Sequence, residues 1–192
     1  MDDGIIREGS FNIESGVGIR AMSGEKTGFA YSDDLSLKAL TAATKNASAI
    51  ARLGRDQVAP TKIAAASTTQ ALYSALNPID SQNAAAKVDL LKRLDVFTRA
   101  LDSRIEQVII SISGSMEHVL IAATDNTLAA DIRPLVRINV TVLMHEKGRR
   151  EQGSAGGGGR HNYDVFFNTE VAFDYARDAV RQASVNLNAV SA

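Results

Sequence analysis

The three histidines, His118, His145 and His161, are the residues with the clearest capacity for catalysis or metal binding. His145 is followed by Glu146, as at the start of the H-E-x-x-H zinc motif. That motif places two histidines one helical turn apart, so that both face one metal ion. Here Arg149 occupies the position of the second histidine, and the pair stands where a strand enters a turn. We therefore assign no metal ligand to His145, and we expect His118 to be exposed at a hairpin.

The remaining reactive side chains form no recognisable catalytic pattern. The chain has no cysteine, which excludes a thiolate nucleophile and a cysteine-based metal site. The adjacent carboxylates Asp33 and Asp34 fit the N-cap of a following helix better than acid/base catalysis. A basic cluster at Lys147, Arg149 and Arg150 has glutamates on both sides, which is typical of a solvated hairpin tip. The sequence therefore predicts no catalytic, cofactor-binding or metal-binding residue.

A run of four glycines followed by an arginine is the least usual stretch of the chain. In one interpretation it is a flexible linker between a strand and a helix. In another, its backbone must pass close to another chain, a peptide or the rest of a larger protein, because glycine leaves no side chain in the way. A third hypothesis makes it an anion- or nucleotide-binding loop. The candidate contact residues are Gly156, Gly157, Gly158, Gly159 and Arg160.

The alternation of apolar and polar residues before this run predicts a long half-buried strand. Its buried face would carry Val136, Ile138, Val140, Val142 and Met144. Further strands are predicted at 108–113 and 119–123, with a tight turn at Gly114-Ser115 between them and another turn at Asp125-Asn126. After the long strand, a charged turn leads into a polar return strand, and together these strands form an antiparallel meander. Short strands are also predicted at Ile5-Ile6, 16–22 and 28–31.

Helical periodicity predicts three amphipathic helices, at about 34–53, 82–101 and 169–187. Asp33 or Asp34 would cap the first, with Gly54 as its stop, and Asp80 or Ser81 would cap the second. The apolar face of the third is Ala172, Ala176, Ala179, Val180, Ala183 and Leu187. Residues 55–81 read as a connecting loop. The predicted fold is α+β, a mainly antiparallel sheet packed with about three amphipathic helices in one domain over 1–192.

The bulk composition indicates a protein of the cytoplasm without a membrane span. The net charge of -1 gives no general attraction to nucleic acid or to anionic lipid. No apolar run approaches the roughly 20 residues that cross a bilayer. The acidic start, Met1-Asp2-Asp3, is not that of a secretory signal.

Several ordered stretches together resemble the TldD/PmbA family, also called modulators of DNA gyrase, and in particular its TldD branch. The N-terminal stretches run over 3–12 and 16–31, and include G-V-G-I-R-A and S-G-E-K-T-G-F-A-Y. The later ones are A-A-T-D at 122–125, L-A-A-D-I-R-P-L-V-R at 128–137, and the glycine run with Arg160.

The resemblance implies a part of a zinc metallopeptidase that works with a PmbA/TldE-type subunit on peptides and unfolded polypeptides. The family's zinc motif, H-E-x-x-x-H with a later cysteine, lies in its C-terminal half. We therefore expect this chain to be a fragment truncated at both ends, inactive alone, that supplies scaffold and contacts to the partner or peptide. Zinc is expected only in the full-length protein. The alternative is a free-standing, non-catalytic module that binds a protein or peptide.

Overall fold

The computed structural model describes residues 1–52 and 72–189, and its fold is α+β, as predicted. Contacts divide the chain into two compact units, where the sequence suggested one domain over 1–192. The smaller unit is formed by 10–61, and the larger by 1–9 together with 62–192.

The smaller unit is a hairpin with one helix. Its elements are β1 (Val17–Ser23), β2 (Lys26–Ser32) and α1 (Leu37–Ala51). Ser36, and not Asp33 or Asp34, caps the helix, because its side chain accepts a hydrogen bond from the backbone N–H of Ala39. Asp34 instead holds this cap in place, accepting from the backbone N–H of Ser36 at 2.7 Å and from its hydroxyl at 2.9 Å. The predicted stop at Gly54 lies outside the described residues.

Small side chains allow α1 to lie close to the hairpin. Ala43, Ala47 and Ala51 are buried on the face of α1 that packs on it. A Cβ at Gly28 of β2 would overlap the carbonyl oxygen of Ala47, so the helix backbone lies directly against this strand.

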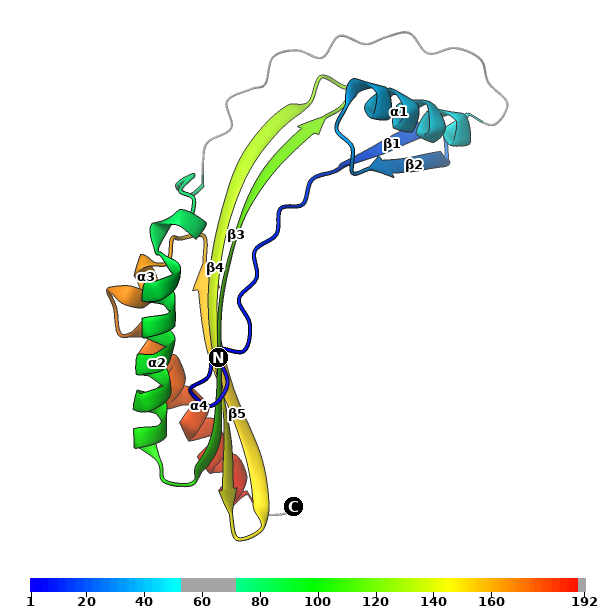
Figure 1. Ribbon diagram of the computed structural model, residues 1–192. Helices are drawn as coiled ribbons and strands as arrows, with labels where there is room; N and C mark the ends of the chain where they lie inside the picture. The colour runs from blue at the N-terminus through cyan, green and yellow to red at the C-terminus, as the bar shows by residue number, and fades with distance from the viewer. Residues whose placement is uncertain (53–71, 190–192) are drawn as a thin grey trace. The chain divides into compact units, whose positions relative to one another are not determined.

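The larger unit contains the predicted meander, as an antiparallel sheet in the order β3-β4-β5 (Figure 1). Its strands are β3 (Ile105–Ala122), β4 (Leu128–Glu146) and β5 (Arg149–Gly159). The turn predicted at Gly114-Ser115 is wrong, since β3 is continuous there and Gly114 pairs with Val136. A Cβ at Gly114 would overlap the hydroxyl of Tyr163, so this glycine admits a distant side chain instead of turning the chain. Asn126, with φ +73°, lies in the predicted turn between β3 and β4.

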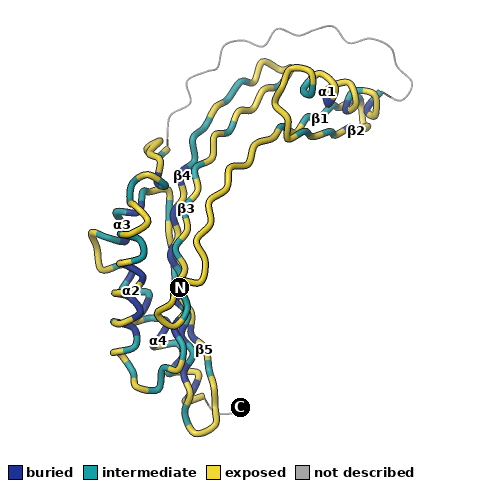
Figure 2. The backbone as a smooth tube through the Cα atoms, in the orientation of Figure 1, coloured by how far each residue is buried: buried dark blue, intermediate teal, exposed yellow. Residues whose placement is uncertain are grey.

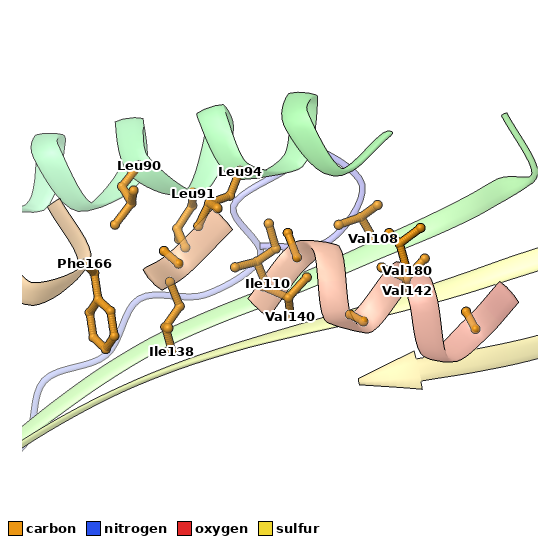
Figure 3. Close-up of a cluster of buried hydrophobic side chains, with 14 of the residues drawn as sticks. Leu90, Leu91, Leu94, Val108, Ile110, Ile138, Val140, Val142, Phe166 and Val180 are labelled. Carbon is orange, nitrogen blue, oxygen red and sulfur yellow. The ribbon is translucent and has the colours of Figure 1, made fainter. Parts of the chain in front are cut away.

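Two long helices, α2 (Ala84–Leu101) and α4 (Val171–Asn188), cover one face of this sheet (Figure 1). Asn83 caps α2 in place of Asp80 or Ser81, accepting from the backbone N–H of Ala86 at 2.8 Å. Leu90, Leu91 and Leu94 of α2 point toward the alternate residues of β3 and β4 (Figure 3). All six residues predicted for the apolar face of α4 are buried. Figure 2 shows this buried layer along α2, α4 and the central strands.

The larger unit also contains two short elements, the 3-10 turn η1 (Ile79–Ser81) and the helix α3 (Asp164–Phe167).

The predicted strand at Ile5-Ile6 is wrong: Ile5 makes only an isolated bridge to Asp2, in a turn with φ +47° at Asp3 and +72° at Gly4. Met1 pairs with β3, where it accepts from the N–H of Ile110 at 2.9 Å. The N-terminal residues therefore cover part of the β3 edge of the sheet.

Candidate functional site

The glycine run forms the last part of β5. Gly156, Gly157, Gly158 and Gly159 pair in register with Asn139, Ile138, Arg137 and Val136 of β4. The flexible-linker interpretation is therefore wrong, because the whole run is paired with a neighbouring strand. The interpretation in which this backbone passes close to a peptide or to another chain stays a prediction.

Helix α4 is the neighbour that two of the β5 glycines accommodate. A Cβ at Gly153 would overlap the carbonyl oxygen of Ala179 and lie 2.5 Å from the backbone nitrogen of Ala183. A Cβ at Gly157 would overlap the hydroxyl of Tyr175. Because real Cβ atoms do not approach other atoms so closely, side chains at these positions would push α4 or Tyr175 away.

The outer edge of β5 presents backbone groups that do not pair with β4. The carbonyl of Gln152 accepts from the side-chain amide of Asn186 at 2.9 Å, so it points away from β4 and toward α4. In an extended strand the backbone groups of alternate residues point to the same side. Ser154, Gly156 and Gly158 therefore direct their N–H and C=O groups outward. None of the turn, loop and cap backbone hydrogen bonds in 1–52 and 72–189 involves these three residues. We call this row the β5 edge.

A polar pocket of about 390 Å³ lies beside the β5 edge. Its α4 residues, Tyr175, Asp178 and Gln182, were not among the predicted site residues, although they follow helical spacing along one flank of the predicted apolar face. Asp178 accepts from Arg181 at 2.6 Å and from Gln182 at 2.9 Å. The hydrogen bond from Arg181 holds the pKa of Asp178 below its ordinary value. The lining residues are Arg137, Asn139, Ser154, Ala155, Gly156, Tyr175, Asp178 and Gln182.

Arg160 has a structural environment at the end of β5. Its guanidinium donates to the carbonyl oxygen of Pro134 at 3.2 Å and lies 5.6 Å from the ring centroid of Tyr73. The Tyr73 hydroxyl in turn donates to Asp131 at 2.9 Å. Residues 156–159 lie in a strand and do not form the loop that the anion-binding hypothesis assumed. Arg160 contacts Pro134 of β4 and the ring of Tyr73.

The histidines lie apart on exposed positions. His118 is exposed, but it lies within β3 opposite Ile132 and not at a hairpin. His145 pairs with Arg150 at the end of β4, and His161 follows β5. Within the part of the chain that the structure describes, no three histidine, cysteine, aspartate or glutamate side chains gather as metal ligands. Those residues therefore do not fit a zinc site. None of the helices described is long and apolar enough to cross a membrane.

Two family models match the chain, one over its N-terminal part and one over most of the larger unit. Residues 1–51 match PmbA/TldA metallopeptidase domain 1, and residues 77–187 match the PmbA/TldA metallopeptidase central domain. The chain belongs to the PmbA/TldD family. The resemblance noted in the sequence is therefore confirmed.

The curated relatives are proteins named metalloprotease TldD homologues. The one from Haemophilus influenzae is 46% identical over 196 residues, which cover 100% of this chain and 41% of the relative. The one from Buchnera aphidicola of Acyrthosiphon pisum is 39% identical, again over 100% of this chain and 41% of the relative. The chain thus spans about two fifths of the length of these relatives.

Solved structures confirm the fold at low sequence identity. A Thermotoga maritima protein named as a candidate modulator of a DNA gyrase matches with a TM-score of 0.73 and 12% identity, over 100% of this chain and 42% of that one. TldE from Thermococcus kodakarensis matches with a TM-score of 0.56 and 12% identity, over 86% of this chain and 36% of that one.

Proposed function

We propose that this chain forms the scaffold of a TldD-like zinc metallopeptidase and contacts an extended peptide or the partner subunit through the β5 edge. The relatives that match it over its full length are named metalloproteases. In this proposal the zinc ligands and the reacting groups belong to a part of the peptidase outside this chain, so the chain alone is inactive. A PmbA/TldE-type subunit is the proposed partner, and the cytoplasm is the proposed compartment.

The observation that carries this proposal is the outward backbone of Ser154, Gly156 and Gly158 next to a pocket. An exposed strand edge binds an extended peptide by adding it as a further strand, through main-chain hydrogen bonds that do not depend on the peptide's sequence. Such recognition suits a peptidase that acts on unfolded polypeptides. A free-standing binding module would use the same edge, and family membership favours the peptidase.

The proposal is tested with a fluorescent, neutral heptapeptide rich in threonine and valine, whose binding to the chain is followed by anisotropy. Two methylated peptides are compared, one N-methylated at its odd-numbered amides and one at its even-numbered amides. One of them should lose binding and the other should keep it, because only one edge of the peptide faces β5. Equal binding of both methylated peptides would contradict strand addition. This comparison uses the unmodified protein, so it does not depend on whether a variant folds.

A protein variant gives a second test. Ser154→Pro removes an outward N–H while leaving the pairing of β4 with the neighbouring residues of β5, so it should weaken peptide binding at least tenfold. Its circular dichroism should match that of the unmodified chain. Cleavage of an unfolded polypeptide by this chain with added zinc, sensitive to a chelator, would overturn the assignment of catalysis to other parts of the protein.

A further inference from the structure

Two opposite charges flank the β5 edge from the two faces of the sheet. Alternate residues of β4 are buried under the helices, and Arg137 belongs to the other, open set. Asp178 projects from α4, which packs on the covered face. Both line the pocket beside the β5 edge. A strand added to this edge would therefore pass between a cation on one side and an anion on the other.

The glycines of β5 allow the side chains of β4 to reach the edge. A Cβ at Gly156 would lie 2.6 Å from the side-chain oxygen of Asn139, so the Asn139 amide occupies the space that a side chain would need. Arg137, opposite Gly158, donates from Nε to that same oxygen at 3.0 Å. Arg137 and Asn139 together thus lie over the bare glycine backbone and form one wall of the pocket.

Asp178 keeps acceptor capacity for a ligand. Its Oδ1 accepts two hydrogen bonds from Arg181 and its Oδ2 accepts one from Gln182. A carboxylate offers about four lone-pair positions, so about one position, on Oδ2, remains for a ligand. An aspartate is ionised at neutral pH, and the hydrogen bonds from Arg181 and Gln182 lower the pKa of Asp178 further below its ordinary value. The next charged side chains along α4, Asp174 and Arg177, pair with each other. Arg181, three residues further along α4, is the cation that pairs with Asp178 itself, and its side chain is 66% exposed.

Successive side chains of an extended strand point to opposite faces of the sheet. We propose that the β5 edge prefers extended peptides in which an acidic side chain, beside Arg137, is adjacent to a basic side chain, beside Asp178. This preference rests on the proposed function, since it requires strand addition at the same edge. The main-chain bonds supply general affinity, and the two charges supply selectivity among extended segments.

The experiment compares four heptapeptides that share one threonine- and valine-rich sequence, with a centre that is neutral, Glu, Lys or Glu-Lys. Against the unmodified chain, each single charge should strengthen binding about two- to fivefold over the neutral peptide, the range of exposed ion pairs, and Glu-Lys should bind most tightly. Arg137→Gln should remove the gain from Glu and keep the gain from Lys. Asp178→Asn should do the reverse.

Matched variants control for net charge. Arg150→Gln, on β5 at the far end of the strand, and Asp174→Asn, on α4 outside the pocket lining, change the charge by the same amounts and should leave both gains intact. Loss of a gain in these controls would show a general charge effect and overturn the proposal. The proposal would also be overturned if the gains in affinity from Glu and Lys remained in both Arg137→Gln and Asp178→Asn.

The outcomes distinguish strand addition at the β5 edge from the charge preference of that edge. If the neutral peptide fails to bind, strand addition itself fails and the proposed function with it. If the neutral peptide binds and all four peptides bind equally, the proposed function stands and the charge preference is refuted. High salt should compress the differences between the peptides and leave the affinity of the neutral peptide nearly unchanged.

Discussion

Gly153 of β5 lies directly against the backbone of Ala179 in α4. A Cβ at this glycine would overlap the Ala179 carbonyl oxygen, and its other close neighbour, the Ala183 nitrogen, is also backbone. Neither atom can rotate away as the end of a side chain can. The separation between β5 and α4 is thus set by a glycine on the strand and alanines on the helix.

Gly153→Ala should therefore destabilise the chain by about 1–3 kcal/mol, the usual cost of overpacking, because α4 must shift as a whole. Chemical denaturation monitored by circular dichroism gives the value. Gly9→Ala is the matched control, since a Cβ at Gly9 has nothing within 4 Å, and it should change the stability by less than about 0.5 kcal/mol. Wild-type stability of Gly153→Ala would show that α4 is not held this closely.

Gly157→Ala should cost less, about 0.5–1.5 kcal/mol, because its obstacle is a side chain. The added methyl would meet the Tyr175 hydroxyl, with the ring carbon that carries it 2.8 Å away. Tyr175→Phe removes that hydroxyl, so it should recover part of the loss when combined with Gly157→Ala. A double-mutant cycle measures this coupling, and strictly additive effects would contradict direct contact between the two residues.

Arg160→Ala should lower stability by about 0.5–1 kcal/mol and leave peptide affinity unchanged. The substitution removes a hydrogen bond to Pro134 and a cation–π contact with Tyr73, both at the surface. Hydrogen exchange should accelerate in 72–76 more than in β4. If calorimetry instead showed a nucleotide bound by the unmodified chain and lost in Arg160→Ala, the anion-site hypothesis would regain support.

The periodicity of apolar residues predicted the elements whose buried residues recur at regular spacing. The buried residues of α4 recur at helical spacing, and the buried face of β4 alternates, so both follow from residue order alone. The turn predicted at Gly114 is wrong, and the glycine run was left between alternatives, because the sequence does not distinguish a glycine that makes room for a distant group from one in a turn or a linker. The reasons lie in Tyr163 for Gly114 and in β4 and Tyr175 for the run.

The caps and the pocket illustrate two further limits. Asp34 and Ser36 are both good capping residues close together, and only the geometry shows that Asp34 holds Ser36 while Ser36 caps the helix. The pocket requires Asp178 of α4 to lie beside Ser154 of β5. That neighbourhood depends on how the helix packs on the strand, which residue spacing within either element does not encode.

Arg104 should make the stability of the fold depend on pH, because it joins the end of α2 to β4 and α4 through charged hydrogen bonds. It donates to Asp102 at 2.7 Å, to Glu146 at 3.1 Å and to Ser184 at 3.1 Å. Its hydrogen bond lowers the pKa of Asp102 from the ordinary 3.8. Because the folded-state pKa is the lower one, the stabilisation is present above about pH 4 and is lost as the pH falls through the folded-state pKa of Asp102.

Arg104→Gln should consequently lower the melting temperature most at neutral pH, and the gap to the unmodified chain should narrow as the pH falls below about 4. Melting curves collected from pH 3 to pH 8 test this. Arg93→Gln removes an exposed ion pair with Asp89 within α2 and should have a small effect at every pH. A gap for Arg104→Gln that stayed constant down to pH 3 would mean that Arg104 stabilises the fold by packing and not through the charge of Asp102.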